Sequence, residues 1–212
     1  MAPNPLPRHR SSLPVSGLLG LAACALLSAP GGARADGFIQ TERLHRSKMF
    51  TLSWEYSIPT TSLQTNLVQG GNAAGIDVGA RFGISRRISL GGAATWNQFT
   101  QSKDPAASMN SFSLGMTAHW YFGNQEIQPY VGVLAGGAYL ESQQAGGAFL
   151  ATWAPMAAPE VGFLFTIADG LALILAGRYQ MNFVTFYVNG DESLPQVKWP
   201  SWASVQLGVG FY

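Results

Sequence analysis

The stretch ASVQLGVGFY, residues 203–212, decides the fold. Every second residue from Ala203 to Phe211 is apolar, and the residues between them are serine, glutamine and glycine. Strict alternation of this kind predicts a β-strand with one apolar and one polar face. An open strand edge pairs readily with other chains, so a terminal strand needs a partner. Pairing this strand with the first strand would leave no edge, and the stretch therefore predicts a closed barrel.

The same alternation recurs along the chain and predicts eight strands in all. They are expected at 50–58, 74–84, 88–96, 111–122, 128–139, 159–167, 171–183 and 203–212. Turn residues such as Gly123-Asn124 and Asp169-Gly170 predict tight connections at 85–87, 123–126 and 168–170. Long connections are expected at 59–73, 140–158 and 184–202, and a connection of intermediate length at 98–110. The sequence thus predicts an all-β, up-and-down antiparallel barrel with short turns at one end, as in transmembrane barrels.

The N-terminal segment has the three parts of a secretory signal peptide. A basic patch at Arg8–Arg10 precedes an apolar stretch at 13–29, and Ala33-Arg34-Ala35 supplies an A-x-A site. We expect cleavage after Ala35. Residues 36–47 would then be a polar periplasmic lead-in, and residues 48–212 the barrel. An alternative is lipidation at Cys24, which ends a lipobox-like Leu21–Cys24, although the apolar stretch continues beyond it.

Charge and composition exclude some classes of function. Removing residues 1–35 removes three of the 12 basic residues and none of the 11 acidic ones, which leaves 9 against 11 and a net charge of −2. Such a chain has no basic excess with which to bind nucleic acid. Charged residues are only 11% of the whole chain, so much of it is either buried or placed in an apolar environment.

The charged residues of the strands share one face. All of them lie opposite the apolar stripe: Glu55, Asp77, Arg81, His119, Glu160 and Arg178. A soluble lipocalin-like barrel would place the apolar stripe inside. In a membrane barrel the stripe faces lipid, where a basic residue at mid-bilayer costs about 2–4 kcal/mol. The clean separation favours the membrane barrel, with these six side chains in the lumen.

Aromatic residues of the stripe gather near both strand ends, which predicts two interfacial girdles. The girdle at the tight-turn end would comprise Phe50, Phe82, Trp120, Phe122 and Phe211. The girdle at the long-loop end would comprise Tyr56, Trp96, Phe112, Tyr139, Tyr179 and Phe183.

On this pattern the chain resembles the small eight-stranded outer-membrane β-barrels, the class of the OmpA transmembrane domain, OmpX and OmpW. The resemblance implies a Gram-negative outer-membrane location, with outer-membrane lipid, lipopolysaccharide and the barrel-assembly machinery as partners. It also implies that Gln206, Gly208 and Phe211 form the assembly signal. The chain departs from the family pattern because Phe211 is penultimate and Tyr212 is out of phase.

The lumen charges admit two interpretations. One is a catalytic or ion-conducting constellation, and the other is a set of salt bridges that compensates buried charges, which two arginines and three acids favour. An enzyme acting on lipid A would use a histidine with a serine and a carboxylate. His119 is the only histidine in the expected strands, and no serine lies two residues from it. No ligand-spaced pair predicts a metal, and no motif predicts a cofactor.

We therefore expect a structural or interaction role in the outer membrane, not catalysis. The loop expected at 140–158 is apolar, with Trp153 and Met156, and OmpW-like barrels suggest binding or limited passage of small hydrophobic molecules there. The alternatives are a lipid A-modifying barrel enzyme of the deacylase kind and a soluble lipocalin-like barrel.

Overall fold

The computed structural model describes residues 48–60, 71–85, 87–100, 108–122, 126–143, 149–187 and 196–212. The chain divides into two units, Met1–Gly37 and Phe38–Tyr212, and every described residue belongs to the second. The expected signal peptide, Cys24, the periplasmic lead-in and the Gly123-Asn124 turn lie outside the described residues.

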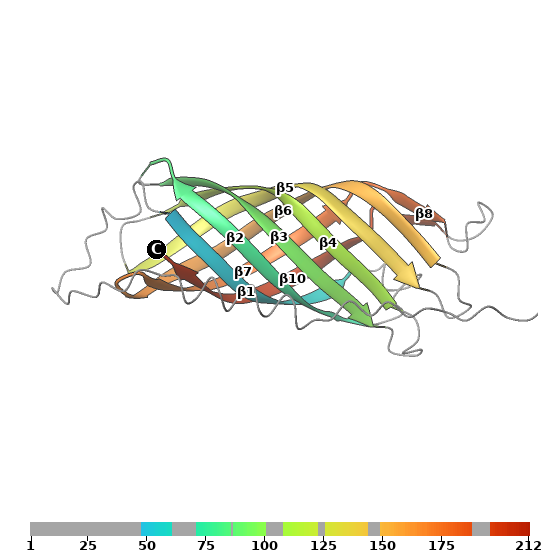
Figure 1. Cartoon of the computed structure of the whole chain (residues 1–212), viewed down its shortest axis with the longest axis horizontal. Helices are drawn as coiled ribbons and strands as arrows, with labels where there is room; N and C mark the ends of the chain where they lie inside the picture. Colours follow the sequence, from blue (N-terminus) through green and yellow to red (C-terminus); the bar gives the residue numbers. More distant parts are fainter. Residues whose placement is uncertain are drawn as a thin grey trace, which may run out of the picture. The chain divides into compact units, whose positions relative to one another are not determined.

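Eight long strands and one short hairpin make up the described fold (Figure 1). The long strands are β1 (Lys48–Pro59), β2 (Ala73–Gly83), β3 (Ile88–Thr100), β4 (Ser108–Tyr121), β5 (Ile127–Gln143), β6 (Phe149–Ala168), β7 (Leu171–Asn182) and β10 (Ser201–Phe211). The hairpin consists of β8 (Thr185–Tyr187) and β9 (Gln196–Lys198).

The long strands close into an antiparallel barrel in the order β1-β10-β7-β6-β5-β4-β3-β2. The last strand pairs with the first from Phe50↔Phe211 to Ile58↔Ala203. The predicted all-β, eight-stranded, closed antiparallel barrel is therefore confirmed, and the terminal strand has no free edge. Figure 1 shows the C-terminus at one end of the barrel and the arrowheads of β3 and β5 at the other.

Several strands run further into the expected long loops than the alternation indicated. The loop prediction for 140–158 is wrong, because β5 continues to Gln143 and β6 begins at Phe149. The segments 98–110 and 184–202 likewise contribute strand residues to β3, β4 and β10, and 184–202 also holds the β8–β9 hairpin. Trp153 and Trp202 thus belong to barrel strands.

Exposure alternates along the strands and identifies the two faces. The outer face carries large apolar side chains, such as Met116 at 68% exposed and Leu114 at 59%. The inner face carries buried serine, threonine, amide and charged side chains, together with two groups of buried apolar ones. This arrangement is the reverse of a soluble lipocalin-like barrel, in which apolar side chains would fill the interior.

Two adjacent glycines of β5 differ in the space around them: Gly136 has no room for a side chain, and Gly137 has room. Substituting each in turn tests how closely β4 and β5 approach each other. A Cβ on Gly136 would collide with the Leu114 carbonyl oxygen and lie 2.5 Å from the Gly115 Cα, both backbone atoms of β4. A Cβ on Gly137 would meet nothing closer than 3.9 Å.

We expect Gly136→Ala to lower the free energy of unfolding by about 1–3 kcal/mol, because the β4 backbone has to move away. Gly137→Ala should leave the stability unchanged or slightly raise it, since alanine restricts the unfolded chain. Urea unfolding of the two variants in lipid vesicles measures this difference. Equal stability of the two variants would contradict the close approach of β4 and β5.

Candidate functional site

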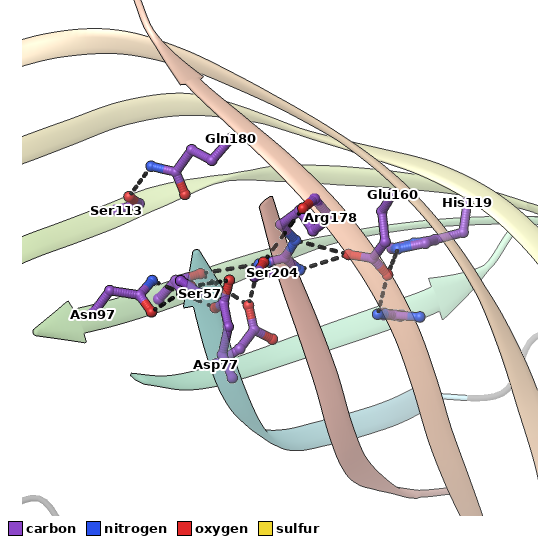
Figure 2. A network of polar contacts seen from close by, with 12 residues as sticks. Ser57, Asp77, Asn97, Ser113, His119, Glu160, Arg178, Gln180 and Ser204 are labelled. Atoms are coloured by element: carbon purple, nitrogen blue, oxygen red, sulfur yellow. Dashed lines mark hydrogen bonds and ion pairs between the residues drawn. The ribbon is translucent and has the colours of Figure 1, made fainter. Parts of the chain in front are cut away.

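The structure places all six charged residues of the expected lumen set on the inner face. Each of Glu55, Asp77, Arg81, His119, Glu160 and Arg178 is buried. They come from β1, β2, β4, β6 and β7, so only barrel closure brings them together. Figure 2 shows the polar network that they form with neighbouring side chains.

Arg178 on β7 is the centre of this network. Its Nε and Nη2 donate to Glu160 Oε2 over 2.9 and 2.6 Å. Its Nη1 donates to Asp77 Oδ2 over 2.9 Å and lies 3.3 Å from Thr95 Oγ1. Thr95 in turn donates to the same Asp77 oxygen over 2.9 Å. One guanidinium thus pairs with two carboxylates from different strands, a strong charge-assisted geometry.

Glu160 on β6 connects Arg178 to Tyr130, Arg81 and His119. Its Oε1 accepts a 2.6 Å hydrogen bond from Tyr130 Oη and lies 3.7 Å from Arg81 Nη2. His119 Nε2 lies 3.6 Å from the same oxygen, which is too long for a strong hydrogen bond. The ring of His119 packs edge-on against Tyr130 with centroids 5.3 Å apart. Because β2 and β6 are four strands apart in either direction, the Arg81–Glu160 pair crosses the lumen.

Glu55 lies at the edge of this network. Its carboxylate oxygens accept 3.5 Å contacts from Ser57 Oγ and Asn97 Nδ2, and Ser204 is a further hydrogen-bond partner. Ser57 and Asn97 are 3.2 Å apart and link β1 to β3. Among the described residues, ion pairs within 4 Å join the other five members of the set and not Glu55.

Several neutral members of the network lie outside the set of six lumen charges predicted from sequence, although Gln206 was predicted for the assembly signal. They are Ser57, Thr95, Asn97, Tyr121, Tyr130, Gln180, Ser204 and Gln206. Their shared signal is the phase of the alternation, since each occupies an inner-face position of its strand. The alternation therefore predicts that these residues face the interior, but it does not predict which of them are in contact.

Glycines on the inner face make room for these side chains. A Cβ on Gly132 would lie 2.5 Å from the His119 ring, and one on Gly162 would lie 2.8 Å from the Tyr130 hydroxyl. A Cβ on Gly75 would collide with the amide oxygen of Asn97. The glycine-rich inner face therefore follows from the size of the polar side chains opposite it.

Two apolar clusters flank the charges along β4 and β6. The cluster nearer the C-terminal end of the barrel is Met49, Tyr121, Tyr130, Leu164, Ala172, Ile174 and Ala176. The cluster at the other end includes Phe99, Met109, Leu134, Leu140, Met156 and Trp202, with Phe99 and Trp202 edge-on at 5.1 Å. A water-filled channel would expose inner side chains, yet the described members of both clusters are at most 7% exposed. The lumen is filled by side chains.

The expected girdle residues all lie on the outer face. Nine are exposed, and Phe211 and Tyr139 are half-buried. The same face also carries three exposed aromatic residues outside the predicted girdles: Trp54, Trp153 and Phe163. Trp199 is also exposed; it lies between β9 and β10 and packs edge-on against Phe183. Trp153 belongs to the segment that was expected to be a loop, and Trp54 lies mid-strand.

The three residues of the expected assembly signal lie on β10. Gln206 and Gly208 face the interior, and Phe211 faces outward. With its amide oxygen turned inward, Gln206 accepts from Arg178 Nη1 and Nη2 over 2.9 and 3.2 Å. A Cβ on Gly208 would collide with Ser53 Oγ. Both residues therefore have a role in lumen packing that is independent of any assembly factor.

The described residues contain no group of three or more histidine, cysteine, aspartate or glutamate side chains that could hold a metal ion. Within the same residues, no helix has the length and apolarity needed to cross a membrane.

Comparison with solved structures identifies the architecture. Neisserial surface protein A matches with a TM-score of 0.54 and 18% identity over 77% of this chain and 96% of its own. The chain has the fold of a small outer-membrane β-barrel. The attachment invasion locus protein Ail of Yersinia pestis has a TM-score of 0.48 and 14% identity over 79% of this chain and 98% of its own. The N-terminal barrel domain of Pseudomonas aeruginosa OprF has a TM-score of 0.46 and 14% identity, over 77% and 96%.

No family model matches the sequence, and no curated protein matches it. At these levels of identity the solved structures establish the fold alone.

Proposed function

We propose that the chain is an outer-membrane barrel with a structural or interaction role and a closed lumen. The observation that carries the proposal is the combination of a lipid-compatible outer face with an interior filled by ion pairs and two apolar clusters. Transmembrane barrels need the first feature. The second opposes passage of water and ions, since eight strands leave only enough space for side chains.

The proposal includes export by the N-terminal signal peptide and recognition of β10 by the barrel-assembly machinery. Gln206, Gly208 and Phe211 would supply that recognition, and outer-membrane lipid and lipopolysaccharide would surround the outer face. The outward position of Phe211 supports contact with an assembly factor or lipid.

The experiment is fractionation of a Gram-negative host that expresses the full chain, followed by gel electrophoresis of boiled and unboiled outer membranes. We expect the protein in the outer-membrane fraction, with a mobility shift on boiling because a closed barrel resists SDS. Reconstituted vesicles should show no ion leakage above empty vesicles. Protein in the soluble periplasmic fraction would contradict the location, and steady ion conductance would contradict the closed lumen.

A second candidate is binding of a small hydrophobic molecule at the outer mouth. The apolar cluster around Phe99 and Trp202 favours it, and Trp202 Nε1 is buried without a hydrogen-bond partner among the described residues. A ligand would have to displace packed side chains. Saturable quenching of tryptophan fluorescence by an apolar alcohol, lost in Trp202→Phe, would support this candidate.

The lipid A enzyme gains no support from the geometry. The ring of His119 is 2% exposed and faces the lumen, while an acyl chain of the outer leaflet lies outside the wall. The cross-strand partner of His119 on the inner face is Ser89, but the Ser89 hydroxyl donates to Tyr121 Oη over 3.3 Å. His119 Nε2 faces Glu160, and its Nδ1 has no hydrogen-bond partner among the described residues, so no serine–histidine hydrogen bond activates a nucleophile there.

A further inference from the structure

One acid on the inner face is left over when the charged side chains are paired. Asp77 and Glu160 form ion pairs with Arg81 and Arg178. Glu55 is 0% exposed, and no arginine or lysine of the described chain lies within 4 Å of its carboxyl group. A charge buried without a partner is costly, and a carboxyl group in such a place takes up a proton instead.

Arg178 has no hydrogen-bond donor left for Glu55. A guanidinium group has five N–H groups. The N–H of Nε and one N–H of Nη2 are directed at Glu160, and one N–H of Nη1 is directed at Asp77. The amide oxygen of Gln206 accepts from the remaining N–H groups of Nη1 and Nη2 over 2.9 and 3.2 Å. This guanidinium is therefore fully engaged with two other acids and one amide.

The neutral neighbours of Glu55 fit a carboxyl group that donates a hydrogen bond. Ser57 Oγ lies 3.2 Å from Asn97 Oδ1, which can only accept, so the single hydroxyl proton of Ser57 is directed there. Ser204 Oγ donates to the carbonyl oxygen of Arg178 over 3.5 Å. Both hydroxyl oxygens then offer lone pairs to Glu55, which a protonated carboxyl group can use and a carboxylate cannot.

His119 does not supply the missing positive charge. A protonated imidazole has two N–H donors, and Nδ1 of His119 has no hydrogen-bond partner among the described residues. Its Nε2 lies 3.6 Å from Glu160 Oε1, and Arg81 Nη2 lies 3.7 Å from the same oxygen. Glu160 is thus already compensated by two arginines, and the geometry fits a neutral histidine.

The charged groups that face Glu55 come from two strands, Asp77 from β2 and Arg178 from β7. The side chains beside it on β1, β3 and β10 are neutral: Ser57, Asn97, Ser204 and Gln206. Asp77 is a second acid, so it opposes another negative charge nearby. The electrostatic surroundings therefore also favour an uncharged Glu55.

These observations together identify a site for one proton. We propose that Glu55 binds a proton in the folded barrel and retains it at neutral pH, so that the paired charges leave the closed lumen without net charge. Glu55 lies opposite Gln206 where β1 meets β10. Release of the proton at alkaline pH puts an unpaired charge on the seam that closes the barrel and weakens it. The inference concerns the lumen alone and does not depend on the cellular location.

The first test compares the full-length protein with Glu55→Gln, which has nearly the same shape and is neutral at every pH. Urea titration in detergent micelles from pH 4 to pH 9 gives the folding equilibrium constants. An unfolded glutamate ionises near pH 4.3, so above about pH 5 the folded parent should hold one more proton than the unfolded chain. The parent-to-variant ratio of equilibrium constants should then fall about tenfold per pH unit, until the folded barrel releases the proton.

Taking the ratio cancels the titration of His119 and of every other group that both proteins share. Ser113→Ala is the control for altered lumen packing, since it removes a neutral inner-face hydroxyl and should change the equilibrium constant by the same factor at every pH. At pH 4 the parent and Glu55→Gln should be similar, because the carboxyl group is protonated in both states. A parent-to-variant ratio that does not change between pH 5 and pH 8 would overturn the inference.

A second measurement observes the carboxyl group itself. In protein labelled with ¹³C-glutamate, the carboxyl signal that is missing from Glu55→Gln belongs to Glu55. We expect its chemical shift at pH 7 to be that of a protonated acid, and a shift typical of a carboxylate would overturn the inference. If the variant does not show the mobility change on boiling that marks a folded barrel, the parent spectrum still decides. The absence of any protonated glutamate signal at pH 7 would contradict the assignment.

Discussion

Replacing Arg178 with methionine is expected to lower the free energy of unfolding by about 3–5 kcal/mol. The guanidinium contacts Glu160 over 2.6 Å and Asp77 over 2.9 Å, and its removal leaves two carboxylates buried without that partner. Arg81 lies 3.7 Å from Glu160 and compensates only in part. Equilibrium urea unfolding of refolded barrel in lipid vesicles, followed by tryptophan fluorescence, measures the loss.

Two controls distinguish uncompensated charge from lost packing. Arg87→Met removes an exposed arginine at the β2–β3 turn and should change stability by less than about 0.5 kcal/mol. Adding Asp77→Asn to Arg178→Met removes the carboxylate whose ion-pair partner is Arg178 and leaves Glu160 beside Arg81, so it should recover part of the lost stability. A loss below about 1 kcal/mol in Arg178→Met alone would contradict the central role of this side chain.

Replacing Met116 with arginine is expected to cost about 2–4 kcal/mol of folding free energy in a bilayer. Met116 lies near the middle of β4, is 68% exposed and is flanked by Gly92 and Ala135 on the outer face. The substitution therefore puts a cation into the hydrocarbon core without removing an internal contact. The same urea titration in lipid vesicles measures it.

The control for Met116→Arg is an arginine on the same outer face but nearer the membrane interface. Ile88→Arg, at the beginning of β3 and 39% exposed, should cost only about 0–1 kcal/mol because it lies near the interface. Met116→Leu should be tolerated, since both side chains are apolar and similar in size. An equal cost for the arginines at positions 88 and 116 would mean that lipid does not surround the strand as proposed.

The sequence was sufficient for the architecture because lipid exposure and a crowded lumen enforce strict alternation. It predicted the closure of β10 on β1, and the inner position of Arg178 and Glu160 follows from the phase of their strands. The sequence pattern could not predict which inner-face side chains contact one another. The Arg81–Glu160 pair joins strands on opposite sides of the lumen, and only the closed geometry brings them within 3.7 Å.

Strand ends were harder to predict because proline and alanine obscure the pattern. Pro155 and Pro159 made the start of β6 resemble a loop, yet both face outward within the strand. The pairing of β6 with β7 pauses at Pro159, which has no N–H to donate, while its pairing with β5 continues. Trp202 was assigned to a loop for a related reason, since a large aromatic on the inner face breaks the expected polar phase.

The central claim is that the apolar face of the strands meets lipid and the polar face lines a filled lumen. Spin labels placed one at a time at residues 112–119 of β4 test it most directly, in a cysteine-free background because Cys24 is the only cysteine. In bilayers, collision with dissolved oxygen should be high at Phe112, Leu114 and Met116 and low at Ser113 and Thr117. High collision rates at Ser113 and Thr117 with low rates at Leu114 and Met116, or no alternation at all, would contradict the account.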